Sequence, residues 1–274
     1  MIPAPFAYQR AGSADEALSL AAEAGEDAKF LAGGHSLLPL MKLRFAVPEV
    51  LIDIGRIRDL SYIRDEGDTI AVGALTRHHD VENSGLLARE LPLLAHAAGC
   101  VGDPQVRHRG TIGGSVSHGD PASDMPGVLL TLDAEFVAVG PGGARTIPAS
   151  EFFTGVFETA LGPQDVLTEI RVPSTSGGWA YLKFARRKQD WATVGVAAVA
   201  SNGGAKVGLV SMGGTPLRAK AVEEALAGGS DAAAAAEHAD EGTEPSSDVA
   251  GSAEYRRHLA RVLTRRALEQ VLAG

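Results

Sequence analysis

Two glycine pairs flanked by hydroxyl side chains are the residues of this sequence best suited to bind an anion. The first pair lies in residues 32–36, with the sequence AGGHS, and the second in residues 111–115, with the sequence TIGGS. Because glycine has no Cβ, consecutive backbone N–H groups can converge on a phosphate, and the neighbouring hydroxyls add donors. Two such loops could hold a diphosphate from two sides, although each pair alone is also typical of an ordinary tight turn.

Other binding motifs and catalytic sites fit these residues less well. The first loop lacks the G-x-G-x-x-G spacing of a Rossmann turn, and the chain has no G-x-x-x-x-G-K-[ST] phosphate loop. Ser36 could be a nucleophile in a strand-to-helix elbow, but Leu38 stands where such an elbow needs its last glycine. His118, Asp120 and Asp124 could be metal ligands, but their spacing matches no standard zinc or iron site, and Asp124 could equally cap a helix.

A basic segment ends in a tryptophan that could contact a planar ring. Lys183 and residues 186–188, which are Arg-Arg-Lys, precede Trp191. The ordinary interpretation is a solvated basic strand edge followed by a buried tryptophan. The alternative is a flat aromatic side chain that stacks on a ring, with a lysine close to a developing negative charge.

The composition excludes several other kinds of site. The chain has 274 residues, a formal net charge of −9 and one cysteine, Cys100, so it cannot by itself build a disulfide, a zinc knuckle or an iron–sulfur cluster. Eight acids and no Lys or Arg lie in residues 221–253, so the rest of the chain is nearly neutral and can accept an anion. No basic, aromatic-rich stripe indicates nucleic-acid binding. No run of 18 apolar residues indicates a transmembrane helix, and we expect a cytoplasmic protein.

The first two thirds of the sequence predict two kinds of local structure. Residues 1–55 predict a β-α-β unit whose helix begins at a capping box formed by Ser13 and Glu16. Residues 56–175 predict an α+β domain with antiparallel hairpins and a helix over residues 86–98.

The last third of the sequence follows a Ser/Gly-rich linker and predicts a separate domain. Residues 176–274 contain two apolar strands joined at Asn202-Gly203, a dipeptide typical of tight hairpins. Helices are predicted over residues 216–226 and 254–272, with Arg256 mostly off the apolar face of the last helix. The acidic segment between these helices predicts a mobile loop or a poorly packed helix.

Several motifs occur in the same order as in one protein family. They are AGGHSLLPLMKLR (residues 32–44), RGTIGGS (109–115) with DPASDMP (120–126), RKQDWA (187–192), GGTPLRA (213–219) and YRRHL (255–259). Together they resemble the FAD-binding medium subunit of molybdenum hydroxylases, the group of xanthine dehydrogenase and aerobic carbon monoxide dehydrogenase. The resemblance covers essentially the whole chain.

The resemblance implies an α+β fold and a set of cofactor contacts. The fold is a two-part FAD-binding domain of the vanillyl-alcohol-oxidase type, residues 1–55 and 56–175, followed by a smaller sheet-plus-helix domain, residues 176–274. The two glycine loops would hold the FAD diphosphate, Asp124 a flavin-side hydroxyl or ring edge, and Lys183 the pyrimidine end, while Trp191 would cover one face. The implied cofactor-binding residues are Ala32, Gly33, Gly34, His35, Ser36, Leu37, Thr111, Ile112, Gly113, Gly114, Ser115, Asp124, Lys183 and Trp191. No catalytic residue or metal ligand is implied on this chain.

The resemblance also implies partners and a direction of electron flow. The flavin would receive electrons from 2Fe–2S clusters on a small subunit, while substrate is oxidised at a molybdenum cofactor on a large subunit. Reduced flavin would then pass two electrons to an external acceptor, in a dimer of heterotrimers that is cytoplasmic or lies at the inner face of the membrane. The alternatives are a stand-alone FAD oxidoreductase of the same fold and a non-redox module whose glycine loops are only turns. The substrate is not encoded in this chain, because the molybdenum pocket would lie on another.

Overall fold

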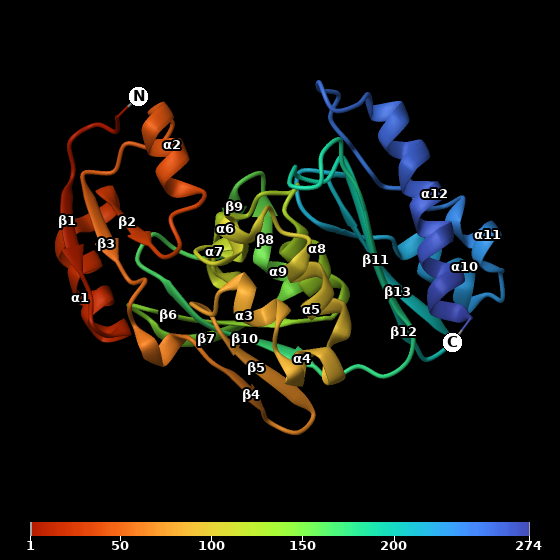
Figure 1. Ribbon diagram of the computed structural model, residues 1–274, viewed down its shortest axis with the longest axis horizontal. Coiled ribbons are helices and arrows are strands. Elements are labelled where there is room, and N and C mark those ends of the chain that lie inside the picture. The colour runs from red at the N-terminus through yellow and green to blue at the C-terminus, as the bar shows by residue number, and fades with distance from the viewer. Residues whose placement is uncertain (1, 274) are drawn as a thin grey trace.

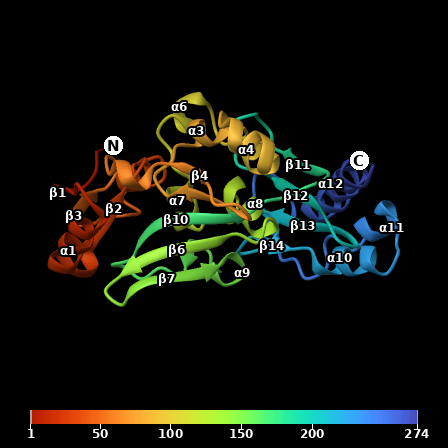
Figure 2. The ribbon, with the colours of Figure 1, turned by 90° about the horizontal axis from the view of Figure 1, so that it is seen from below.

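The computed structural model describes residues 2–273, and its three larger β-sheets follow one another along the longest axis of the molecule (Figure 1, Figure 2). These sheets come from residues 7–53, 63–173 and 179–218, in chain order. A two-stranded ribbon adds to them. Within residues 2–273, no helix is both long and apolar enough to cross a membrane.

The N-terminal part is a parallel sheet with one long helix packed on it. Its elements are β1 (Ala7–Arg10), α1 (Ala14–Ala24), the 3₁₀ turn η1 (Gly25–Asp27), β2 (Ala28–Leu31), α2 (Leu37–Leu43) and β3 (Val50–Asp53), with strand order β1-β3-β2. Helix α1 begins at the predicted cap, because Ser13 Oγ accepts a hydrogen bond from the N–H of Glu16. Glu16 Oε2 in turn accepts one from the N–H of Gly12. The predicted β-α-β elements are therefore present.

The middle part is an antiparallel sheet covered by short helices. Its elements are η2 (Arg58–Leu60), β4 (Ile63–Asp65), β5 (Thr69–Gly73), α3 (His78–Glu82), α4 (Gly85–Glu90), α5 (Pro92–Gly99), α6 (Pro104–Arg107), α7 (Ile112–His118), α8 (Asp124–Thr131), β6 (Glu135–Gly140), β7 (Gly143–Pro148), α9 (Ala149–Phe152), β8 (Phe153–Gly155), β9 (Glu158–Thr159) and β10 (Val166–Pro173). The strand order is β4-β5-β10-β6-β7. The single helix predicted over residues 86–98 is wrong: α4 ends before Leu91, and Pro92 begins α5, because the residue before a proline is driven out of the helical region.

The C-terminal part is a second antiparallel sheet with helices on one face (Figure 1). Its elements are β11 (Trp179–Phe184), β12 (Val194–Ser201), β13 (Gly204–Val210), β14 (Leu217–Arg218), α10 (Lys220–Ala227), α11 (Ala232–Ala236) and α12 (Ala253–Leu272). The hairpin is where it was predicted, with Gly203 at a φ of 85°. The helix predicted from residue 216 begins only at Lys220, because Leu217 and Arg218 pair with β13 instead.

Strand β12 joins the middle and C-terminal parts because both of its faces are buried. Ala197 and Val199 belong to the core beneath the middle helices, whereas Val196 and Ala198 belong to the core beneath α12. A strand buried on both faces is apolar at every position, and this explains the unbroken apolar run from Val194 to Ala200. The C-terminal sheet therefore packs against the middle helices on one face and against α12 on the other, and this fixes its strands relative to the middle part.

One expectation about the last helix was wrong, and the acidic segment contains the expected helix, packed better than expected. Arg256 lies on the packed side of α12 and is only 4% exposed, because its guanidinium is bound by a backbone carbonyl and by Asp248. The acidic segment contains a short packed helix, α11, which begins at the cap residue Asp231 and buries Ala235 and Ala236.

Candidate functional site

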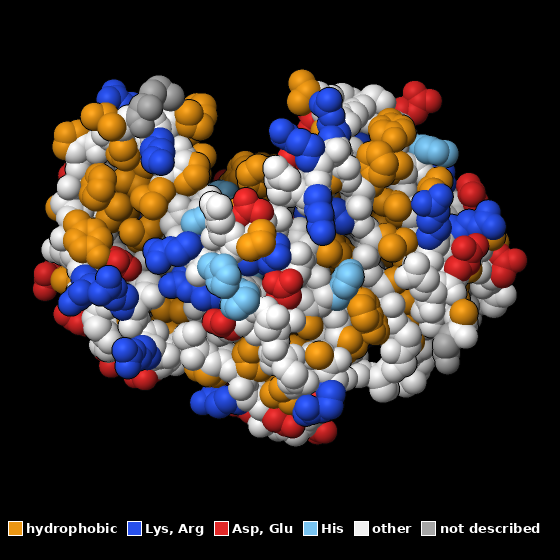
Figure 3. Space-filling model, viewed as in Figure 1, with side chains coloured by type: hydrophobic (Ala, Val, Ile, Leu, Met, Phe, Trp, Pro, Cys, Tyr) orange, Lys and Arg blue, Asp and Glu red, His pale blue; other side chains and the backbone are white. Residues whose placement is uncertain are grey.

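A cavity of about 940 Å³ lies where the N-terminal sheet, the middle helices and the end of the C-terminal sheet meet. Figure 3 shows the surface hollowed between the N-terminal lobe and the rest of the molecule. The volume is within the range of about 300–1,000 Å³ that is usual for cofactor sites. The sequence-predicted residues all line this cavity except Ile112, whose side chain is fully buried in the core of the middle part.

The first glycine loop presents unpaired backbone amides. Residues 33–36 lie between β2 and α2, and within residues 2–273 no intramolecular hydrogen bond uses their N–H groups. Gly34 has a φ of 78°, a conformation that other residues rarely adopt. His35 Nδ1 lies 3.2 Å from the carbonyl oxygen of Gly33, so the imidazole bonds within the loop. Consecutive unpaired amides of this kind form a concave site for an anion such as a phosphate.

The second glycine pair has a different structure from the one expected. Gly113 and Gly114 lie in the first turn of α7, and Thr111 caps this helix by accepting a hydrogen bond from the N–H of Gly114 at 3.1 Å. The N–H groups of residues 112, 113 and 115 are also bonded, to the carbonyls of Thr76, Ala74 and Thr111. This loop therefore offers a ligand its side chains and the positive end of a helix, not a row of unpaired amides.

The two glycine loops touch through their backbones. A Cβ on Gly33 would lie 2.8 Å from the Cα of Gly110 and would overlap the carbonyl oxygen of Arg109. The Arg77 guanidinium donates to that same Arg109 carbonyl and, at 3.2 Å, to the carbonyl of Gly55. Burial, and secondarily the charge of Arg109, lower the pKa of Arg77 from its usual value. Gly33 is thus required for packing one loop against the other.

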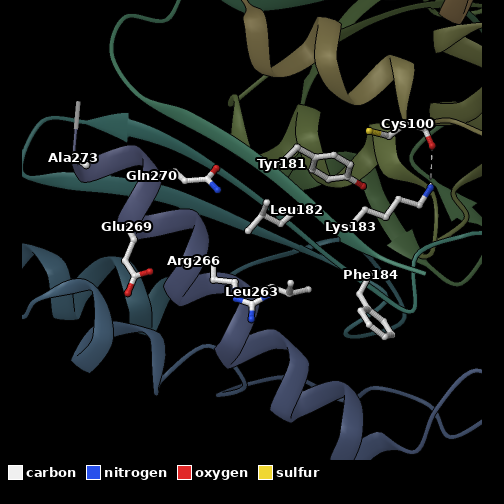
Figure 4. Close-up of a pocket in the computed structure, with 10 residues that line it drawn as sticks. All are labelled: Cys100, Tyr181, Leu182, Lys183, Phe184, Leu263, Arg266, Glu269, Gln270 and Ala273. Carbon is white, nitrogen blue, oxygen red and sulfur yellow. Dashed lines mark hydrogen bonds between the residues drawn. The ribbon is translucent and has the colours of Figure 1, made fainter. Parts of the chain in front are cut away.

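A buried polar cluster closes the other end of the cavity. Lys183 Nζ lies 2.9 Å from Asp124 Oδ2. It also donates to the carbonyl of Cys100 at 3.0 Å (Figure 4). The Tyr181 hydroxyl donates to the second oxygen of Asp124. Burial raises the pKa of the Asp124 carboxyl, and the charge of Lys183 and the Tyr181 hydroxyl oppose that shift. Burial, and then the Asp124 charge, raise the pKa of Tyr181 well above its usual value.

The structure shows that Asp124 is not the cap residue of a helix and that Trp191 is not buried. Ser123, not Asp124, is the cap residue of α8, and Asp124 makes no side-chain capping bond. The Lys183 side chain is only 9% exposed, whereas Trp191 is 68% exposed and lines the cavity from the loop between β11 and β12. The interpretation of a solvated Lys183 followed by a buried tryptophan is therefore wrong. Residues 186–188 are exposed, as that interpretation expected.

Sequence reasoning missed two residues that shape the cavity. Arg77 clamps the loops, and its neighbour His78 lines the cavity while only 3% exposed. Burial, and then the charges of Arg107 and Arg77, lower the pKa of His78 to about 4. Both residues follow β5 and meet the second glycine loop through a bridge between Arg77 and Thr111. No local pattern signals such a contact, because its partners are far apart in the sequence.

These features together define a class of protein. A row of unpaired amides fits a diphosphate, and apolar walls such as Phe30 and Leu167 fit an aromatic ring. An exposed tryptophan and a buried ion pair line the same cavity. The site therefore fits an elongated dinucleotide cofactor, in a fold that is neither a Rossmann nor a P-loop domain.

Comparison with known proteins identifies the family. Residues 4–175 match the FAD binding domain in molybdopterin dehydrogenase, and residues 179–271 match the CO dehydrogenase flavoprotein C-terminal domain. The chain therefore belongs to the FAD-binding medium subunits of the molybdenum hydroxylase family, in agreement with the sequence resemblance and with FAD as the cofactor.

Individual relatives match over nearly their full length. The chain is 44% identical over 290 residues to the carbon monoxide dehydrogenase medium chain of Hydrogenophaga pseudoflava, covering 100% of this chain and 99% of the relative. It is 38% identical to the 6-hydroxypseudooxynicotine dehydrogenase complex subunit alpha of Paenarthrobacter nicotinovorans, covering 99% and 96%. The solved structure of carbon monoxide dehydrogenase from Hydrogenophaga pseudoflava that lacks the Mo-pyranopterin moiety has a TM-score of 0.96 at 46% identity, covering 100% and 99%. Quinoline 2-oxidoreductase from Pseudomonas putida 86 has a TM-score of 0.93 at 31% identity, covering 100% and 99%.

The loop contact predicts the effect of a substitution at Gly33. Gly33→Val should abolish FAD retention, because its side chain would push the first loop away from Arg109 and misplace the unpaired amides. The flavin content of the purified full chain measures this. Gly85→Val is the control, because a Cβ at Gly85 meets nothing within 4 Å. Full flavin content in Gly33→Val would refute the assignment.

Burial of His78 predicts an acid-sensitive component of stability. Its pKa is about 4 in the folded protein against 6.5 for the free side chain, so the unfolded chain takes up the proton first as the pH falls. The contribution of neutral, buried His78 to the free energy of unfolding is therefore fully present above pH 6.5. It decreases as the pH falls toward 4, and by pH 4.5 it is smaller by roughly 2–3 kcal/mol. Urea unfolding at pH 7 and pH 4.5 should show a smaller decline in His78→Gln than in the parent protein. The exposed His258→Gln should decline like the parent, and an equal decline in all three proteins would contradict the prediction.

Proposed function

We propose that this chain is the electron-output subunit of a molybdenum-containing dehydrogenase, in which FAD takes electrons from iron–sulfur clusters of a partner and gives them to an external acceptor. Bound FAD supplies the one-electron and two-electron chemistry that side chains cannot. The unpaired amides of residues 33–36 are the observation that carries the proposal, because donors left without a partner in the protein would suit the diphosphate of FAD.

The chain's own residues would hold and orient the cofactor. The amides of residues 33–36 would bind the diphosphate, with the Ser115 hydroxyl and the start of α7 on its other side. The Asp124–Lys183 pair would present a fixed, water-shielded dipole to the flavin ring, and Trp191 would cover one face of it. Because bound FAD would supply the redox chemistry, this role requires no general acid or base from the chain, and the protein's task would be orientation and electrostatic tuning.

The proposal needs partner chains. The single cysteine of this chain cannot hold an iron–sulfur cluster, so the clusters must lie on another subunit. The names of the relatives, a medium chain and a subunit of a dehydrogenase complex, support an assembly with further chains. We infer a small iron–sulfur subunit and a large subunit with the molybdenum cofactor, assembled as a dimer of heterotrimers. The cytoplasmic location stays a prediction, as do the substrate and the electron acceptor.

Reconstitution and copurification test the proposal. The full chain incubated with FAD should retain a yellow chromophore after gel filtration, and the tagged native protein should purify with an iron–sulfur and a molybdenum-containing chain. Absence of bound chromophore would contradict the flavin site. A native protein that retains FAD, runs alone and oxidises a substrate would instead be a stand-alone oxidoreductase.

The buried ion pair predicts different effects on stability, and the same effect on FAD affinity, in a single and a double variant. Lys183→Met should lower the free energy of unfolding by about 3–5 kcal/mol, because it leaves the Asp124 charge buried and unpaired. Adding Asp124→Asn should recover part of that loss, since the carboxylate charge is then gone. Both variants should bind FAD more weakly than the parent protein in a fluorescence titration.

The control for these variants is Lys188→Met, which changes an exposed lysine in the loop that follows β11. It should match the parent in both stability and FAD affinity. If the double variant binds FAD as tightly as the parent, the ion pair has no role toward the cofactor.

A further inference from the structure

Ser211 has a backbone conformation that only glycine adopts freely. It follows β13 directly, and its φ is 64°, in the left-handed region. Two glycines, Gly213 and Gly214, lie close by in the chain, yet the left-handed position itself carries a side chain with a hydroxyl. A residue held in this region persists where its surroundings determine it, and such residues cluster at functional sites.

The conformation of Ser211 lets one residue bind two separate parts of the molecule. Its N–H donates to the carbonyl of Pro121 at 3.0 Å, and its Oγ donates to the carbonyl of Ala192 at 2.7 Å. Pro121 belongs to the middle part, and Ala192 directly follows Trp191 in the loop before β12. Ser211 therefore ties the base of the Trp191 loop to the FAD-binding part of the chain.

The Pro121 side of this connection leads to the cavity. Two residues further on, Ser123 Oγ lies 2.8 Å from Ser115 Oγ, at the second glycine loop. The next residue, Asp124, is the buried carboxylate that pairs with Lys183. The segment that Ser211 binds is thus the one that carries two of the side chains lining the cavity.

The Ala192 side leads to Trp191. Its side chain is 68% exposed, so its position depends on the backbone that follows it. Three hydrogen bonds fix that backbone. The Ala192 carbonyl accepts from Ser211, the Thr193 carbonyl accepts from the buried Arg256, and the Thr193 N–H donates to the carbonyl of Phe184 at 2.8 Å. Of these three anchors, Ser211 is the one that also bonds to the middle part, at Pro121.

We propose that Ser211 is a positioning residue that fixes Trp191 over the cofactor cavity. The proposal rests on the proposed FAD site, since it is the flavin ring that Trp191 would cover. The hydroxyl of Ser211 is the essential group: alanine removes it and keeps the unfavourable φ, whereas glycine removes it and relieves the φ. Only the glycine substitution therefore relieves the backbone strain, whereas both substitutions remove the bond to Ala192.

Tryptophan fluorescence tests the proposal in the full chain. The chain has two tryptophans, so Trp179→Phe leaves Trp191 as the only one. In that background, Ser211→Ala and Ser211→Gly should both lower the anisotropy of Trp191 emission in FAD-free protein, because the loop base is released. Both should also bind FAD about five- to tenfold more weakly, the effect of losing one hydrogen bond. Ser230→Ala, an exposed serine in the same background, is the control and should match the parent.

The outcomes separate this proposal from a merely structural role and from the proposed function. If Ser211 only supports the fold, Ser211→Ala and Ser211→Gly should both leave Trp191 anisotropy unchanged, and this result would overturn the proposal. Failure of the parent protein to bind FAD would refute the proposed function instead. The anisotropy of the FAD-free variants would still decide whether Ser211 holds Trp191.

Discussion

The architecture of the site depends on the contact between the backbone at Gly33 and the backbone at Arg109 and Gly110. This contact joins a parallel sheet to an antiparallel one, and it is possible only because Gly33 has no Cβ. The Arg77 guanidinium completes it by binding a carbonyl from each side. The first loop held in this way lines the cavity, and its N–H groups at residues 33–36 make no hydrogen bond within the described residues 2–273. The unpaired amides of the first loop are thus a consequence of how the N-terminal and middle parts pack against each other.

The opposite end of the cavity is fixed by a different kind of interaction. Strand β12 is buried on both faces, which makes the C-terminal sheet part of the same body as the middle helices. From that sheet Tyr181 and Lys183 reach Asp124 at the start of α8. A buried ion pair is weak evidence for stability, because desolvation offsets much of the attraction. Its value here is a defined polar arrangement at the wall of the cavity.

Much of this arrangement can be predicted from the sequence, and the exceptions have physical reasons. Local signals located the capped helix, the hairpins and the two glycine loops, and the order of the motifs identified the family. Local signals could not distinguish the two loops, because the N–H groups of residues 112 and 113 are bonded to Thr76 and Ala74, partners distant in the chain. For the same reason Arg256 was placed on the wrong side of its helix, since the carbonyl that binds it belongs to Thr193.

Amide hydrogen exchange tests most directly the claim that the first glycine loop, and not the second, supplies the free amides of the site. Exchange would be followed residue by residue in the full chain with and without FAD. In FAD-free protein, residues 33–36 should exchange fast and residues 112–115 slowly, because only the latter are bonded within the protein. FAD should then slow exchange at residues 33–36. If FAD leaves residues 33–36 unchanged, or if residues 112–115 exchange fast without it, the account is wrong.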